Sequence, residues 1–218
     1  MTDREKMLAG ELYYPQDAEL AAIRLAAHRL IDRFNQTGDG ETELRAELLQ
    51  KILGRAGANL EMTPPVRFDY GCNTYIGDRC YFNFNATFLD CAEIRIEDDV
   101  LVGPNVSFLT PLHPLLAAER NFFFDAKGTK RNLEYARPIL IKRGVWLGGG
   151  VIVNPGVTIG AGSVIGSGSV VTRNIPEGVL AFGNPCRVVR KLTGADSVRP
   201  KFKQTESSPL TVDKENSQ

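Results

Sequence analysis

The sequence predicts a mainly β fold in which the chain coils through short flat sides, preceded by a helical region. Between residues 141 and 171 a large aliphatic residue recurs at every sixth position, and a small or β-branched residue recurs four positions after each one. A helix would need a period of about 3.6 residues and a strand a period of about two. A period of six instead suits a chain that turns a corner after each side.

The six-residue repeat is uninterrupted over residues 141–176. Its aliphatic anchors are Ile141, Leu147, Val153, Ile159, Ile165 and Val171, and the second positions are Val145, Val151, Val157, Ser163, Ser169 and Ile175. Glycines beside the anchors, at Gly148, Gly160 and Gly166, would supply the backbone freedom that tight corners require. With strands stacked about 4.8 Å apart and about three sides to a turn, we expect roughly two full turns.

A second, less regular tract precedes this repeat. Its anchors are Ile76, Phe82 and Phe88 in one phase and Ile96, Val102 and Phe108 in another. Residues 112–138 separate the two tracts and carry no six-residue pattern. This segment is long enough to be a functional loop, and His113, one of only 2 histidines in the chain, lies at its root.

Amphipathic helical periodicity is clearest in the first part of the chain. One amphipathic helix is expected after Asp17, which could cap it, and a second ends at Gly54. The chain therefore divides into a helical cap over 1–60, the coil over 61–185 with its loop 112–138, a short C-terminal helix over 186–194 and a tail over 195–218. The polar composition of the tail predicts disorder.

The overall composition argues against several classes of partner and site. Lys and Arg total 26 and Asp and Glu total 26, so no net field favours nucleic acid or an anionic membrane surface. The N-terminus lacks the apolar run of a signal peptide, and the apolar stretch 144–162 is broken by Pro155, so we expect a cytoplasmic protein without a membrane span. The 4 cysteines lack CxxC spacing and accompanying histidines, which argues against a zinc site, and they are few for a disulfide framework in a chain of this size.

Several short motifs occur in the order typical of one known family. From residue 4 to about residue 193 the chain carries EKMLAGELY, RFDYG, NFNATFLD, TPLHP, GVWLGGG, VNPGVTIGAGSVIGSGSVVT and GNPCRVVRKL. This set resembles the hexapeptide-repeat acyltransferases, and within them the maltose/galactoside O-acetyltransferase group that includes nodulation-type acetyltransferases. The resemblance implies a left-handed parallel β-helix of triangular section with an N-terminal α-helical cap, assembled as a homotrimer with active sites between subunits.

The resemblance also implies an activity. Members of the group move an acetyl group from acetyl-CoA directly to a hydroxyl of a sugar or small glycoside and require no metal. His113 matches the position of the family's general base. Histidine suits this role because its ordinary pKa of about 6.5 allows proton removal near neutral pH. A loop histidine bonded only to a backbone carbonyl is the structural alternative.

The positions around the acceptor carry over one at a time. Asn83 matches a side chain beside the reacting centre, although a corner asparagine of a β-helix would look the same. Tyr81, Asp17 and Asp69 match the acceptor pocket, where carboxylates bind sugar hydroxyls, and Asp17 could equally be only a helix cap. Cys91 stands where galactoside-type members carry an acceptor-binding aspartate, so the resemblance puts a galactoside in doubt without affecting catalysis.

The positions that the resemblance assigns to acetyl-CoA lie toward the end of the coil. Trp146 matches the tryptophan beside the thioester arm, the amide of Gly149 matches the oxyanion-side donor, and Ser167 matches a groove position between subunits. Guanidinium groups suit phosphate oxygens, and the positions matching those around the phosphates and adenine are Thr172, Arg173, Arg187 and Arg190. Interface packing is the alternative for the tryptophan, and a solvated basic face is the alternative for the last two arginines.

Other functions remain open at this point. The acceptor could be an amine or an antibiotic hydroxyl. The chain could also be a non-catalytic hexapeptide-repeat binding subunit, although such a subunit would have no reason to keep Asn83, His113 and Trp146 together. A zinc hydratase of the carbonic-anhydrase type is excluded, because it needs several histidine ligands and the repeat region holds a single histidine.

Overall fold

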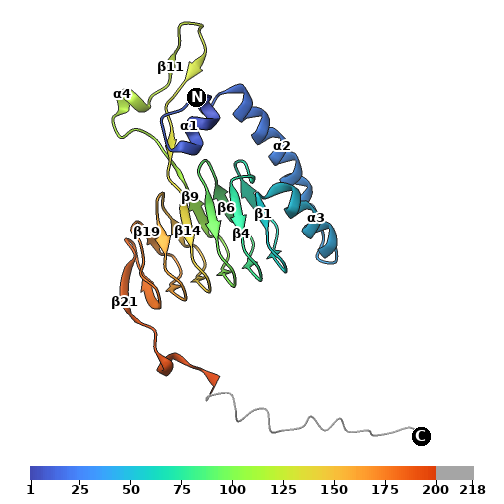
Figure 1. Ribbon diagram of the computed structural model, residues 1–218, viewed down its shortest axis with the longest axis vertical. Helices are drawn as coiled ribbons and strands as arrows, with labels where there is room; N and C mark the ends of the chain where they lie inside the picture. Colours follow the sequence, from blue (N-terminus) through green and yellow to red (C-terminus); the bar gives the residue numbers. More distant parts are fainter. Residues whose placement is uncertain (200–218) are drawn as a thin grey trace, which may run out of the picture.

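A computed structural model describes residues 1–199, and its first part is a helical cap (Figure 1). The cap contains α1 (Asp3–Ala9), α2 (Ala18–Asn35) and α3 (Thr42–Ile52). The carboxylate of Asp17 caps α2, because it accepts hydrogen bonds from the backbone N–H groups of Glu19 and Leu20 at 2.9 and 3.3 Å. Within residues 1–199, these helices are too short or too polar to cross a membrane.

The rest of the described chain is a parallel β-helix with three sides, which confirms the mainly β coil. Side 1 contains β1 (Arg55–Ala56), β4 (Thr74–Ile76), β7 (Ile94–Ile96), β14 (Ile139–Ile141) and β17 (Thr158–Ile159). Side 2 contains β2 (Glu61–Met62), β5 (Tyr81–Phe82), β8 (Leu101–Val102), β15 (Trp146–Leu147), β18 (Val164–Ile165), β20 (Val179–Phe182) and β21 (Arg187–Lys191). Side 3 contains β3 (Val66–Phe68), β6 (Ala86–Leu89), β9 (Ser107–Leu109), β16 (Ile152–Val153) and β19 (Val170–Val171).

The strand register confirms the predicted six-residue repeat. Leu147 lies opposite Ile165 and Val153 lies opposite Val171, so strands one turn apart pair with their anchors aligned. All six predicted anchors are 0% exposed, and the second positions are buried as well. Phenylalanines fill the earlier turns, where the rings of Phe88 and Phe108 stack with centroids 4.9 Å apart.

The predicted role of three glycines is wrong. The left-handed backbone conformation occurs instead at Gly144, Gly150, Gly156, Gly162 and Gly168. Gly148, Gly160 and Gly166 are needed because the next turn of the coil passes too close for a side chain. A Cβ on Gly160 would lie 2.5 Å from the backbone carbonyl carbon of Pro176. The six-residue period predicts the positions of both sets of glycines. Only the structure shows which set adopts the left-handed conformation and which lies against the next turn.

The predicted C-terminal helix over 186–194 is also wrong. Residues 187–191 form β21, which pairs antiparallel with β20 at the open edge of side 2. The β-branched pair Val188 and Val189 favours a strand, and this edge offers unpaired backbone groups to bind it. A short 3-10 turn, Gly194–Asp196, follows where the tail was expected to begin. The rest of the predicted disordered tail, residues 200–218, lies outside the described residues.

The loop 112–138 projects from the coil beside α1 (Figure 1). It contains α4 (Ala117–Arg120) and a small hairpin of β11 (Phe123–Phe124) and β12 (Lys130–Arg131). At its base β10 (Pro111–Leu112) pairs antiparallel with β13 (Tyr135–Ala136). This pairing brings the two ends of the loop together, so residue 113 and residue 134 come to face each other.

Candidate active site

His113 is held at the base of the loop by the residues opposite it. Its Nδ1 lies 3.0 Å from the backbone carbonyl oxygen of Leu133. A carbonyl oxygen can only accept a hydrogen bond, so Nδ1 carries the hydrogen and the lone pair of the neutral ring is on Nε2. Nε2 lies 3.8 Å from Oε2 of Glu134, and the histidine side chain is 44% exposed. The ring is therefore fixed in place while the nitrogen that can accept a proton stays accessible.

Glu134 is a site residue that the sequence did not reveal. Its side chain is only 12% exposed, and its Oε1 accepts a hydrogen bond from the hydroxyl of Tyr13. Tyr13 is itself buried, and burial raises the pKa of its hydroxyl, which therefore stays protonated and donates. The loop lacks a periodic pattern, so only the β10–β13 register identifies this carboxylate as the partner of His113.

Two of the residues predicted to bind the acceptor, Asp69 and Cys91, lie beside Tyr13 and Glu134. The thiol of Cys91 donates to Oδ2 of Asp69 at 3.5 Å. Burial raises the pKa of Asp69 and of Cys91, and the Glu134 carboxylate raises both further. The structure thus brings Asp69 and Cys91 together with Tyr13 and Glu134 in one polar cluster between the cap and the coil.

Two further carboxylates near this cluster have structural partners. Asp17 uses its carboxylate to cap α2, which is the role that the sequence left open beside sugar binding. Asp90 is completely buried and accepts hydrogen bonds from the backbone N–H of Tyr70 at 2.8 Å and the hydroxyl of Thr74 at 3.1 Å. Burial nevertheless raises the pKa of Asp90 to about 6.

A second group of predicted residues lies on side 2 and at the corner that follows it. Tyr81 and Trp146 both lie opposite Leu101 on side 2, with 37% and 53% of their surfaces exposed. Ser167 lies beside Gly148, one turn further along the coil. The amide N–H of Gly149 donates no hydrogen bond within residues 1–199, so it is available to a ligand.

Asn83, at the same corner as Gly149, has a structural contact of its own. Its Oδ1 accepts a hydrogen bond from the backbone N–H of Phe84 at 2.8 Å, as expected of a corner asparagine.

A single chain does not bring together the polar cluster around His113 and the second group of residues around Trp146 and Gly149. His113 follows β9, at the edge where the chain leaves side 3. Gly149 precedes β16, at the edge where the chain enters side 3. Because β9 and β16 pair directly, with Ser107 opposite Ile152, the whole width of side 3 separates the two groups.

The predicted basic positions at the end of the coil differ in their contacts. Thr172 and Arg173 are exposed after β19. Arg187 donates to the backbone carbonyl of Cys186 at 2.9 Å and has no carboxylate partner within residues 1–199. Arg190 instead binds both carboxylate oxygens of Asp196, at 2.9 and 2.6 Å, and holds the pKa of that carboxyl down to about 2. Arg187 is therefore freer to bind an anion than Arg190.

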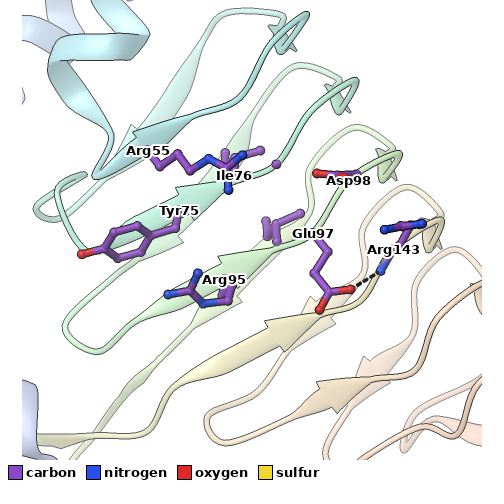
Figure 2. A pocket seen from close by; sticks show the side chains of 9 residues that line it. Arg55, Tyr75, Ile76, Arg95, Glu97, Asp98 and Arg143 are labelled. Atoms are coloured by element: carbon purple, nitrogen blue, oxygen red, sulfur yellow. Dashed lines mark hydrogen bonds between the residues drawn. The ribbon is translucent and has the colours of Figure 1, made fainter.

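A shallow cavity of about 250 Å³ on side 1 contains none of these residues (Figure 2). Two of its three arginines already have carboxylate partners. Arg95 binds both oxygens of Glu93, at 2.8 and 3.1 Å, and Arg55 lies 3.5 Å from Asp78. No group of three or more potential metal ligands occurs within residues 1–199. The candidate active site is therefore the polar cluster around His113.

Comparisons with known proteins place the chain in a family. Residues 6–57 match the maltose acetyltransferase hexapeptide capping motif, and residues 138–173 match the bacterial transferase hexapeptide motif. The chain is 41% identical over 187 residues to nodulation protein L of Rhizobium meliloti, a match that covers 86% of this chain and 97% of the relative.

Two solved structures are similar along almost their whole length. A maltose O-acetyltransferase from Clostridium difficile 630 matches with a TM-score of 0.83 and 41% identity, over 88% of this chain and 98% of that one. A galactoside acetyltransferase in complex with coenzyme A matches with a TM-score of 0.81 and 39% identity, over 92% and 94%. The chain therefore belongs to the hexapeptide-repeat acyltransferases. Within them it falls in the maltose/galactoside O-acetyltransferase group.

Proposed function

We propose that the protein is an acetyl-CoA-dependent O-acetyltransferase that acts on a hydroxyl of a sugar or small glycoside, with His113 as general base. The observation that carries this proposal is the geometry of His113. Its Nδ1 is committed to the Leu133 carbonyl oxygen at 3.0 Å, so Nε2 is left to accept a proton from an incoming hydroxyl. A solved relative is in complex with coenzyme A, which supports the same donor here.

The reaction can proceed in one transfer without a covalent enzyme intermediate. The acceptor hydroxyl oxygen attacks the thioester carbonyl carbon while its proton moves to Nε2 of His113. The negative charge that develops on the carbonyl oxygen is stabilised by the free N–H of Gly149. Collapse of the tetrahedral intermediate expels the coenzyme A thiolate, which takes the proton back from the imidazolium. Oε2 of Glu134, at 3.8 Å from Nε2, stabilises the imidazolium while it exists.

This chemistry requires a second copy of the chain. His113 and Gly149 lie on opposite edges of side 3, so a site containing both is formed only where two coils meet. The exposed residues Tyr81, Leu101 and Trp146 form an apolar row on side 2 that suits packing against a sister subunit and the thin arm of the coenzyme. A homotrimer satisfies this requirement because each interface in a closed ring is equivalent.

The polar cluster supports a polyhydroxyl acceptor. The carboxylates of Asp69 and Glu134 accept hydrogen bonds, which sugar hydroxyls donate. Cys91 cannot replace the aspartate of galactoside-type members, because burial raises the pKa of its thiol and keeps it neutral. We therefore favour a glucose- or maltose-type acceptor over a galactoside.

At the other end of the bound coenzyme, Arg187, Arg173 and Thr172 would contact its phosphates.

The proposal is tested by measuring coenzyme A thiol release from acetyl-CoA with a panel of acceptors. The panel contains glucose, maltose, a galactoside, glucosamine and chloramphenicol, and each rate is corrected for acetyl-CoA hydrolysis. We expect release that depends on a sugar hydroxyl, with the acetyl ester recovered in the product. Transfer only to the amine or to chloramphenicol would replace the acceptor class, and no transfer to any acceptor would reject the proposal.

A further inference from the structure

The segment that holds His113 is itself held by the N-terminal cap. Tyr13 forms an antiparallel bridge to Glu134, with backbone N–H to oxygen distances of 2.9 Å and 3.2 Å in the two directions. Three residues on, the side chains of Gln16 and Asn132 bond to each other, and the backbone N–H of Asn132 donates to Gln16 at 3.4 Å. We call residues 13–16 the clamp segment.

Aromatic contacts extend the clamp segment onto the loop hairpin. The guanidinium of Arg131 lies over the ring of Tyr14, 4.9 Å from its centroid. The rings of Tyr14 and Phe123 meet edge to face with centroids 6.1 Å apart. The cap therefore contacts the second half of the loop at residues 131, 132 and 134.

Both contacts of the His113 ring come from this same stretch of the loop. Leu133 supplies the carbonyl oxygen for Nδ1, and Glu134 supplies the carboxylate that faces Nε2. The two oxygens of Glu134 are divided between the two partners, because Oε1 accepts from Tyr13 and Oε2 faces the histidine. The Tyr13 hydroxyl thus determines which way the carboxylate points.

We propose that Tyr13 is a positioning residue for acetyl transfer, which acts on His113 through Glu134. The inference rests on the proposed function for its catalytic consequence, but the geometry it describes can be measured separately. Tyr13 is 1% exposed, so a phenylalanine would fill the same space, and only the donated hydrogen bond would be lost. The charged or titratable groups around the Glu134 carboxylate are Tyr13, Cys91, Asp69 and His113.

The first test measures the ring geometry without using activity. The ¹⁵N chemical shifts of labelled His113 distinguish the protonated from the unprotonated ring nitrogen, and His113→Asn assigns the signal against that of His28. In the wild-type protein we expect the neutral ring to carry its hydrogen on Nδ1. Tyr13→Phe should shift the population toward the Nε2–H form, because the Glu134 carboxylate, released from the Tyr13 hydroxyl, can turn toward the ring and accept a hydrogen bond from Nε2. An unchanged population in a folded Tyr13→Phe variant would overturn the proposal.

Tyr14→Phe is the matched control, because the Tyr14 hydroxyl has no hydrogen-bond partner within residues 1–199 while its ring keeps the same contacts. It should leave both the tautomer population and the turnover number unchanged. If Tyr14→Phe shifted the population as far as Tyr13→Phe, general loosening of the cap would explain the result and the proposal would fail.

The second test measures kinetics with an accepted sugar. Misplacement of a catalytic group by about 1 Å can lower the rate on the order of 10²-fold, so we expect Tyr13→Phe to lower kcat by about 10- to 100-fold. The KM for acetyl-CoA should not change, because the proposed coenzyme-binding residues Trp146, on side 2, and Gly149, at the corner that follows it, lie outside the cluster that Tyr13 orders.

A double variant then decides whether Tyr13 acts through Glu134. Tyr13→Phe in a Glu134→Gln background should lower kcat no further than Glu134→Gln alone. Additive losses would mean that Tyr13 acts by another route, which contradicts the proposal. Absence of any transferase activity in the wild-type protein would reject the proposed function, while the nuclear magnetic resonance comparison would still decide whether Tyr13 positions His113.

Discussion

The Nδ1 of His113 lies 3.0 Å from the backbone carbonyl oxygen of Leu133, and this contact closes the root of the loop. A histidine bonded to a backbone carbonyl could have been a purely structural residue. Here the same bond fixes the tautomer that a general base requires, because it leaves the lone pair on the exposed Nε2. The structural and catalytic interpretations of this residue are therefore compatible.

Gly160→Ala should destabilise the coil. Its new Cβ would lie 2.5 Å from the Pro176 carbonyl carbon, which belongs to the backbone of the next turn and cannot move aside easily. Overpacking of this kind usually lowers the free energy of unfolding by about 1–3 kcal/mol. Urea denaturation of the wild-type protein and the variant measures this loss. Gly40→Ala is the matched control, because a Cβ there would meet no atom within 4 Å and the change should cost less than about 0.5 kcal/mol. Equal losses would contradict the close approach of the two turns.

Asp90 should make the protein less stable as the pH rises from about 4 to 6. Burial raises the pKa of Asp90 to about 6, whereas in the unfolded chain an aspartate has a pKa of about 3.9. In this window the folded protein keeps a proton that the unfolded chain releases, so rising pH favours unfolding by about 1 kcal/mol per unit.

The comparison with Asp90→Asn isolates this effect from other carboxylates. Asp69 also has a raised pKa and contributes a slope of the same sign in both proteins, whereas the lowered pKa values of Asp99, Asp125 and Asp196 change stability mainly below about pH 4. The unfolding free energy from urea titrations at several pH values should therefore fall less steeply, or rise, in the variant over pH 4–6. Parallel curves for the two proteins would show that Asp90 does not titrate there.

Arg187→Ala should raise the KM for acetyl-CoA with little change in kcat, because phosphate contacts far from the thioester contribute binding to ground state and transition state alike. Arg190→Ala should have a smaller effect, since its guanidinium is already bonded to both oxygens of Asp196. Steady-state kinetics with varied acetyl-CoA measures both. A normal KM in Arg187→Ala would leave that arginine a surface residue, and a larger effect at Arg190 would reverse the assignment.

If Asn83 stands beside the reacting centre, as the family resemblance implies, His113→Ala and Asn83→Ala should each be inactive and should restore activity when they share an oligomer. His113→Ala and Asn83→Ala change residues at opposite edges of side 3, so a mixed interface can combine an intact histidine with an intact asparagine. Random mixing would make about one quarter of the sites native. Co-expressed, doubly tagged mixtures should therefore exceed the activity of either variant alone. No gain in mixed oligomers would mean that each chain holds a complete site.

The repeat made most of the fold predictable, because the six-residue spacing alone identifies buried anchors such as Ile159 and Ile165. The C-terminal strand was not predictable in this way. Its pairing partner is the open edge of side 2, and Val188 and Val189 are too few to show a period. The roles of the glycines depend on how closely successive turns approach, which no local pattern encodes.

The candidate site could be predicted from the sequence where a residue belongs to a motif, but not where its position depends on pairing between distant segments. His113, Asp69 and Cys91 were found through the family resemblance and lie around one polar cluster. Tyr13 and Glu134 were missed, because they meet through an antiparallel bridge across more than a hundred residues of sequence. No sequence pattern placed the two groups of site residues on opposite edges of side 3.

The most direct measurement is the single-turnover rate of acetyl transfer from bound acetyl-CoA to an accepted sugar, compared between the wild-type protein and His113→Ala. General-base catalysis contributes about 10²- to 10⁴-fold, so the variant should lose at least about 10²-fold in rate while its acetyl-CoA affinity and oligomeric state stay unchanged. A variant that binds acetyl-CoA normally and transfers the acetyl group at the wild-type rate would contradict the account.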